Sequence, residues 1–113
     1  MIKNAKITST MLGREDRGMF TWIIFIKFDS VACGVGGYVL GNYNPMTDIT
    51  TFNNRSMESI SKVLEVVGVN KWEDLPGKYI RFEDNGIGKR VTKIGNIIED
   101  KWFDLKEFFE NKL

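Results

Sequence analysis

The stretch MFTWIIFIKF, residues 19–28, is the most strongly apolar part of the chain and decides the fold. It is rich in β-branched and aromatic residues, which favour a strand over a helix. Because side chains alternate along a strand, Ile23 and Phe25 fall on one face and the other apolar residues on the opposite face. That second set comprises Phe20, Trp22, Ile24, Ile26 and Phe28. A strand that is apolar on both faces is expected at the centre of a sheet, or covered on both sides.

The segments around this strand predict two further strands. Residues 2–12 are rich in Ile, Thr and Ser and predict a half-exposed strand. Residues 31–43 predict another, after a turn at residues 29–30. Glycines within it permit a bulge, sharp curvature or close approach of another backbone. They are Gly34, Gly36, Gly37 and Gly41. Residues 44–54 are polar and predict a loop.

Two helices are predicted in the second half of the chain. Residues 56–67 carry apolar side chains at helical spacing, with Ser56 placed to cap the first turn and Gly68 to end the helix in a left-handed conformation. A second, short helix follows Asp104, which has capping-box spacing to Glu107 although Asp replaces the usual Ser or Thr. Apolar side chains around this cap predict a staple and a core-facing stripe: Phe103, Leu105, Phe108 and Phe109.

Two more strands complete the prediction. Residues 78–83 and 89–98 alternate as strands, joined by a hairpin connection at residues 84–88. The predicted order is β-β-β-α-β-β-α, and strands joined by short turns indicate a mainly antiparallel sheet. We therefore expect an α+β fold: one domain, residues 1–113, with a twisted sheet of about five strands and two helices packed on it.

The amino-acid composition excludes several classes of catalytic and metal-binding site. The chain has no histidine and one cysteine, Cys33, which excludes histidine bases, Ser-His-Asp and Cys-His nucleophiles, an intrachain disulfide and a thiolate zinc cluster. A net charge of +1 argues against a dedicated duplex-DNA binder or a nucleic-acid mimic, although a local basic patch stays compatible with it. We expect a protein that is not an enzyme and needs no cofactor or metal. With no visible signal peptide and no apolar run long enough for a membrane span, the expected location is the cytoplasm.

A charged turn and two tyrosines are the candidates for contact with a protein partner. Alternating charges are also what an ordinary solvated turn carries, so a structural interpretation stands beside the functional one. Adjacent carboxylates supply too few ligands for a metal ion. The candidate partner-binding residues are Arg14, Glu15, Asp16, Arg17, Tyr38 and Tyr43.

The glycine-rich segment at residues 34–38 is the candidate for contact with a small ligand. Glycines allow close approach of a phosphate, but neither the helix nor the lysine of a phosphate loop follows, so a curved strand is the structural alternative. The candidate ligand-binding residues are Gly36, Gly37, Tyr38, Arg81 and Arg90.

Basic and aromatic residues at positions 78–93 are the candidate for contact with single-stranded nucleic acid, which is bound by stacking and charge. They are Lys78, Tyr79, Arg81, Phe82, Lys89, Arg90 and Lys93. Glu83 and Asp84 dilute this field, so a solvated sheet face is the alternative. Trp72 and Trp102 are expected in the core, or else exposed as interface anchors.

Ordered motifs extend along the whole chain. They are IKNAKI at 2–7, MLGRED at 11–16, GGY at 36–38, VGV at 67–69, WEDL at 72–75, GKYIR at 77–81 and IGNIIEDKWF at 94–103. In these motifs the chain resembles a family of small proteins encoded by phages and prophages of Firmicutes. The resemblance implies a phage accessory protein acting in the cytoplasm of a bacterial host.

Three functions follow as expectations from this setting. The first is an anti-CRISPR-like inhibitor that binds a component of a host defence system and works as a monomer or homodimer. The second is a sponge that sequesters a nucleotide immune signal. The third is an accessory single-strand binder in phage recombination. Context and size suggest these roles by analogy, and the site itself has to decide between them.

Overall fold

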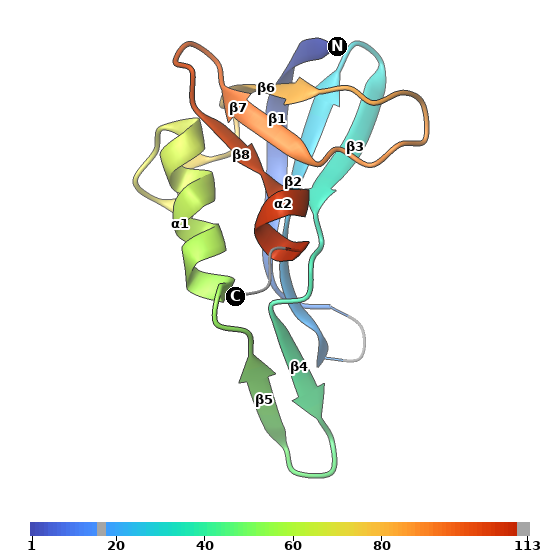
Figure 1. Ribbon diagram of the computed structural model, residues 1–113, viewed down its shortest axis with the longest axis vertical. Helices are drawn as coiled ribbons and strands as arrows, with labels where there is room; N and C mark the ends of the chain where they lie inside the picture. Colours follow the sequence, from blue (N-terminus) through green and yellow to red (C-terminus); the bar gives the residue numbers. More distant parts are fainter. Residues whose placement is uncertain (16–17, 111–113) are drawn as a thin grey trace.

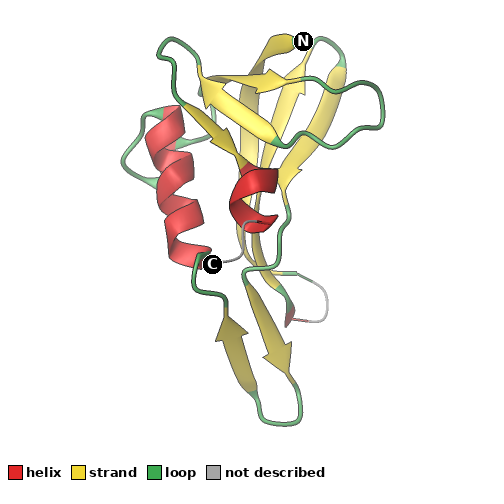
Figure 2. Cartoon of the chain, in the orientation of Figure 1, coloured by secondary structure: helices red, strands yellow, loops and turns green. Residues whose placement is uncertain are grey.

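The computed structural model describes residues 1–15 and 18–110 and is dominated by strands (Figures 1 and 2). The strands are β1 (Ile2–Arg14), β2 (Phe20–Phe28), β3 (Val31–Gly36), β4 (Gly41–Asn44), β5 (Ile49–Phe52), β6 (Tyr79–Glu83), β7 (Lys93–Asn96) and β8 (Trp102–Asp104). The helices are α1 (Ser56–Val67), a 3-10 turn η2 (Trp72–Asp74) and α2 (Leu105–Glu110). None of these helices in the described part of the chain is long and apolar enough to cross a membrane.

The predicted fold class is wrong, because the strands form one eight-stranded antiparallel sheet rather than a sheet of about five strands. The predicted strand at residues 31–43 is broken at Gly36 and Gly37, whose φ angles of 107° and 81° turn the chain out of the extended region. The predicted loop at residues 44–54 instead holds β5, which pairs with β4 as a hairpin. The four residues of β5 favour a strand, but they are too few to show alternation and stand within an otherwise polar segment.

β2 lies inside the sheet, between β1 on one side and β3 and β4 on the other. Trp22, Ile24 and Ile26 are buried on its inner face. Its outer face is not covered, since Phe25 is 39% exposed. The prediction of a central strand is therefore confirmed, whereas cover on both faces is not, since on the outer face Ile23 is half-buried and Phe25 is exposed.

β1 is shared by two parts of the sheet. Its first residues pair with β6, from Ile2 opposite Glu83 to Lys6 opposite Tyr79, and the rest of the strand pairs with β2. The register shifts between Ile7 and Ser9, a bulge that lets one strand bend. The strand order β3-β2-β1-β6-β7, with α1 between β3 and β6, resembles that of the five-stranded OB barrel, although no pairing between β3 and β7 closes it among the described residues. The β4–β5 hairpin, β8 and α2 are additions to it.

The two ends of this curved sheet are held together by side chains. Arg90, in the connection between β6 and β7, donates a hydrogen bond to the Gly36 carbonyl of β3 at 2.7 Å. Its guanidinium lies 4.0 Å from the centre of the Tyr38 ring, and Tyr38 stacks on Phe109 of α2 at 4.4 Å. This stack closes the space between β3 and the C-terminal helix.

The helix ends partly follow the prediction. Gly68 has a φ of 90° and ends α1, with the Gly68 and Val69 amides donating to the Leu64 carbonyl, which confirms the predicted stop. The Ser56 cap is wrong, because its hydroxyl donates to the Leu40 carbonyl at 2.8 Å and no side chain caps the helix. The start of α2 is confirmed: the Glu107 amide donates to the Asp104 carboxylate at 3.0 Å.

Trp22, in the core, and the half-buried Trp72 meet edge to face, with ring centres 6.0 Å apart. The Trp22 indole donates to the Ser59 hydroxyl at 3.1 Å, whereas the buried Trp72 Nε1 has no hydrogen-bond partner among the described residues. A buried donor without a partner costs about 1–3 kcal/mol.

We therefore expect unequal effects when each of these indoles is shortened. Trp72→Phe removes the unpaired N–H along with some ring area, so its unfolding free energy should change by no more than about 1 kcal/mol. Trp22→Phe loses a satisfied hydrogen bond and leaves a void, and should lower that free energy by about 2–4 kcal/mol. Urea unfolding of both variants measures the difference, and equal losses would contradict it.

Candidate functional site

The predicted partner-binding residues that the structure describes, Arg14, Glu15, Tyr38 and Tyr43, do not form one surface. Arg14 and Tyr43 line a shallow pocket beside Asp48, where the Tyr43 hydroxyl donates to the Asp48 carboxylate at 2.7 Å. This hydrogen bond raises the pKa of Tyr43. Glu15 is next to Arg14, whereas Tyr38 belongs to the stack with Arg90 and Phe109. Asp16 and Arg17 lie outside the described residues.

The predicted ligand-binding residues are brought together except for Arg81. Gly36, Tyr38 and Arg90 are in contact, and Gly37 donates its amide to the Trp22 carbonyl at 2.9 Å. The Arg90 guanidinium is engaged by a carbonyl and a ring, and burial raises the pKa of Tyr38. The side chains of Tyr38 and Arg90 are therefore engaged in contacts within the protein.

The predicted groove at residues 78–93 does not form as expected. Phe82 is fully buried inside the sheet and stacks near Phe28 at 4.6 Å. Arg81 donates to the carbonyls of Asn96 and Glu99 at 2.6 and 2.7 Å and lies over the Trp102 ring at 4.8 Å. Trp102 is half-buried on the outer surface, not a core residue as the sequence predicted. Tyr79 remains, 56% exposed at the start of β6.

A different surface of the sheet combines basic side chains with aromatic rings. Lys6 of β1 pairs across the sheet with Lys27 of β2 on one side and with Tyr79 of β6 on the other, so the three side chains stand in one row on the outer face. Phe25 lies two residues from Lys27 on the same face. We call Lys6, Phe25, Lys27 and Tyr79 the aromatic–basic face. Sequence reasoning named Tyr79 and noticed Phe25 but missed both lysines.

The two lysines of this face are not neutralised. In residues 1–15 and 18–110 neither forms a salt bridge, although the Lys6 ammonium lies 6.0 Å from the Tyr79 ring centre. Like charges directly opposite each other weaken a sheet. Nearby Lys3 shows the usual arrangement, because its hydrogen-bonded salt bridge to Asp84 at 2.7 Å raises the Lys3 pKa and lowers that of Asp84. The Lys6–Lys27 pair thus places two positive charges side by side, with the Tyr79 ring as the only stabilising neighbour of Lys6 that the described residues show.

The neighbours of this face leave its rings open to solvent. Gly34 of β3 pairs across from Phe25, and a Cβ at Gly34 would contact both Ile23 and the edge of the Phe25 ring. The absent side chain keeps that side of the ring accessible. At the other end of the row, a shallow hollow of about 780 Å³ has Asn4, Lys78 and Tyr79 in its wall. The face therefore offers two rings with open space beside them.

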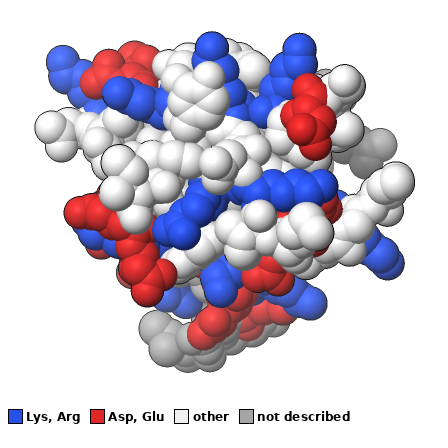
Figure 3. Space-filling view, turned by 90° about the horizontal axis from the view of Figure 1, so that it is seen from above, with Lys and Arg blue, Asp and Glu red and all other residues white. Residues whose placement is uncertain are grey.

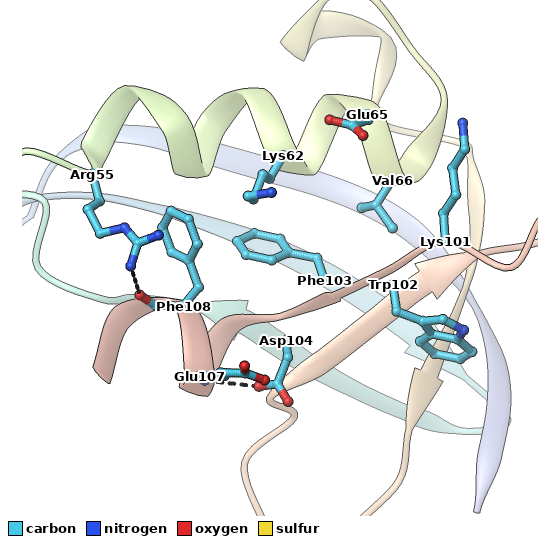
Figure 4. Close-up of a pocket in the computed structure, with 10 residues that line it drawn as sticks. All are labelled: Arg55, Lys62, Glu65, Val66, Lys101, Trp102, Phe103, Asp104, Glu107 and Phe108. Carbon is cyan, nitrogen blue, oxygen red and sulfur yellow. Dashed lines mark hydrogen bonds between the residues drawn. The ribbon is translucent and has the colours of Figure 1, made fainter. Parts of the chain in front are cut away.

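A separate cleft of about 320 Å³ lies between α1 and the β8–α2 segment (Figure 4). Val66, Phe103 and Phe108 form its apolar floor. Both signs of charge surround this floor, from Lys62 and Lys101 to Glu65, Asp104 and Glu107. Several of these groups already have internal roles: Arg55 donates to the Phe108 carbonyl at 3.0 Å, and Asp104 caps α2. No sequence pattern predicted this cleft, because it depends on how β8 packs against α1.

Charge elsewhere on the molecule is mixed. Seen from above, acidic and basic side chains both occur at the upper end of the molecule, without one field of a single sign (Figure 3). Among the residues that the structure describes, no three His, Cys, Asp or Glu side chains are placed to hold a metal ion. Comparison with known proteins adds no assignment: no family model, no curated protein and no solved structure matches the chain.

Proposed function

We propose that the protein binds single-stranded nucleic acid on the aromatic–basic face and performs no chemistry on it. The observation that supports this most is the unneutralised Lys6–Lys27 pair, with an exposed ring at each end. Phosphates supply the counter-charge that the lysines lack, and bases can stack on Phe25 and Tyr79 without a sequence requirement.

Single strands fit this face better than a duplex does. Bases in a duplex are stacked on each other and cannot lie on protein rings, whereas unpaired bases can. Adjacent strands are about 4.8 Å apart, so Tyr79 and Lys27 are separated by two strand spacings, roughly 10 Å. That is a compact footprint for a few nucleotides. The small net charge of +1 favours a binder of moderate, salt-sensitive affinity.

The OB-like connectivity supports the same function by analogy alone. OB barrels bind oligonucleotides and oligosaccharides across the face of their second and third strands, which correspond here to β2 and β3. Because one fold hosts many functions, the side chains of the face have to carry the proposal. The role in phage recombination fits this activity and stays a prediction, as do the defence-inhibitor and nucleotide-sponge alternatives.

Fluorescence anisotropy with a labelled 15-nucleotide mixed-sequence DNA tests the proposal. We expect binding to the single strand in 50 mM salt, weaker binding to the matching duplex, and a log–log salt slope of about −1.4 to −2 for two or three phosphate contacts. The corresponding RNA shows whether the sugar matters. Absence of binding at 100 μM protein, or equal binding to the duplex, would overturn the proposal.

A further inference from the structure

The β4–β5 hairpin projects away from the rest of the molecule (Figure 1). It is attached where Phe20 of β2 pairs with Gly41 of β4 and where the Phe20 and Phe52 rings meet edge to face at 5.4 Å. A two-stranded hairpin without further strands or packing is marginally stable in water. Most of this hairpin therefore lacks the support that a third strand gives.

β5 is the terminal strand in the sheet order, and its outer side is open. The Asn53 amide donates inward to the Leu40 carbonyl at 2.9 Å. Because backbone direction alternates along an antiparallel strand, Ile49 and Thr51 also point toward β4, and Thr50 and Phe52 point their N–H and C=O groups outward. These outward groups form a template for one more antiparallel strand.

The edge strand β5, ITTF, is protected by its short length of four residues but not by its composition. Natural edges are guarded by charged residues, proline or bulges, and this strand has no charge and no proline. Ile49 and Phe52 are 58% and 53% exposed. An uncharged edge has no side chain that could form a salt bridge with a charged partner. Two copies of this edge can approach each other without electrostatic repulsion.

We infer that β5 pairs with β5 of a second copy of the chain, antiparallel, about a two-fold axis perpendicular to the sheet. Such an axis puts the same face of both sheets on the same side of the dimer. Paired residues must then point to the same face, so one residue of β5 lies opposite the same residue of the second copy. Centred on Thr51, the pairing sets Phe52 opposite Thr50 of the second copy, a favourable aromatic–β-branched pair, and does so twice. Centred on Thr50, it would set the Asp48 carboxylate beside Phe52.

The inferred pairing converts two weakly supported hairpins into one four-stranded sheet. At least three strands with an apolar face are needed for a sheet to be stable by itself, and the single hairpin does not reach that number. A contact of four residues from each copy is small, so we expect a dimer in reversible exchange with the monomer. It lies apart from the aromatic–basic face and does not depend on the proposed function.

Cysteine cross-linking tests the register of this dimer in a Cys33→Ser background. Thr51 would be a non-hydrogen-bonded pair with its own copy, with Cα atoms about 4.5 Å apart, within disulfide range. Thr51→Cys should therefore form a disulfide-linked dimer under mild oxidation. Thr50→Cys is the matched control, because Thr50 would lie diagonal to its copy at about 7–8 Å, too far to bridge. Equal cross-linking of both variants would overturn the inference.

Sedimentation of the unmodified chain tests the association itself. We expect the mean mass to rise with concentration from 13.0 kDa toward twice that value. Thr50→Pro removes an outward amide and blocks the edge without removing a bond to β4, so it should keep the chain monomeric and folded. Thr50→Lys places a charge on the edge and should do the same if the proline variant fails to fold. A monomeric parent chain at 1 mM, or variants that still associate, would overturn the inference.

Discussion

Replacing Lys6 and Lys27 together by glutamate is expected to weaken binding of a single-stranded oligonucleotide about 100-fold. A hydrogen bond to a charged group contributes about 1.5–3 kcal/mol, and 1.4 kcal/mol corresponds to a tenfold change in affinity. Losing two phosphate contacts accounts for this factor. The salt slope should also fall by about 1.4, because each contact with a single strand contributes about 0.7. Anisotropy titrations from 50 to 200 mM salt measure both quantities.

Replacing both lysines by glutamate is expected to change nucleic-acid binding but not the stability of the sheet. It replaces one like-charged cross-strand pair by another, so the unfolding free energy should stay nearly constant. Lys71→Glu with Lys106→Glu is the matched control, since both lysines are exposed, lie off the face and give the same net charge. If the control weakens binding as much as the Lys6 and Lys27 variant does, bulk charge and not the face is responsible.

Gly36→Ala is expected to be the most damaging of the single substitutions considered. A Cβ at Gly36 would lie 2.6 Å from the Trp22 ring and 2.7 Å from the Trp22 carbonyl oxygen, and φ is 107°. A left-handed backbone costs about 1–2 kcal/mol for a residue with a Cβ, and overpacking adds about 1–3 kcal/mol. A combined loss of about 2–5 kcal/mol is a large fraction of the stability of a small domain.

Gly37→Ala separates the effect of backbone strain from the effect of overpacking. Its φ is 81°, but a Cβ there would meet nothing within 4 Å, so about 1–2 kcal/mol is expected. Urea unfolding of both variants, with m-values compared, measures the difference. If instead the two variants were equally stable, and both lost oligonucleotide binding, the glycines would be a ligand surface as the sequence first suggested.

The elements that sequence predicted well are those specified by local chemistry. The apolar alternation of β2, the helical spacing of α1, the left-handed Gly68 and the Asp104 cap each involve neighbours a few residues apart. β5 and β8 were missed because they are only four and three residues long, too short to show a periodic pattern. Without them the strand count and the fold class came out wrong.

The candidate site was harder to predict because it depends on register. Lys6 and Lys27 are 21 positions apart in sequence, and the sequence contains no signal that pairs them. The bulge between Ile7 and Ser9 changes which residues lie opposite each other along the rest of β1. The sequence therefore favoured residues 78–93, where basic and aromatic side chains are close together along the chain. In the structure, however, Phe82 of this segment is buried.

The double pairing of β1 also orders the events of folding. The β1–β2–β3 meander joins neighbours in sequence, so little chain entropy is lost when it forms. Pairing Ile2 with Glu83 closes a loop through most of the chain, which is much slower unless one edge already exists. We therefore expect β1 to pair first with β2. The free edge of β1 then serves as the template on which β6 and the second half of the chain assemble.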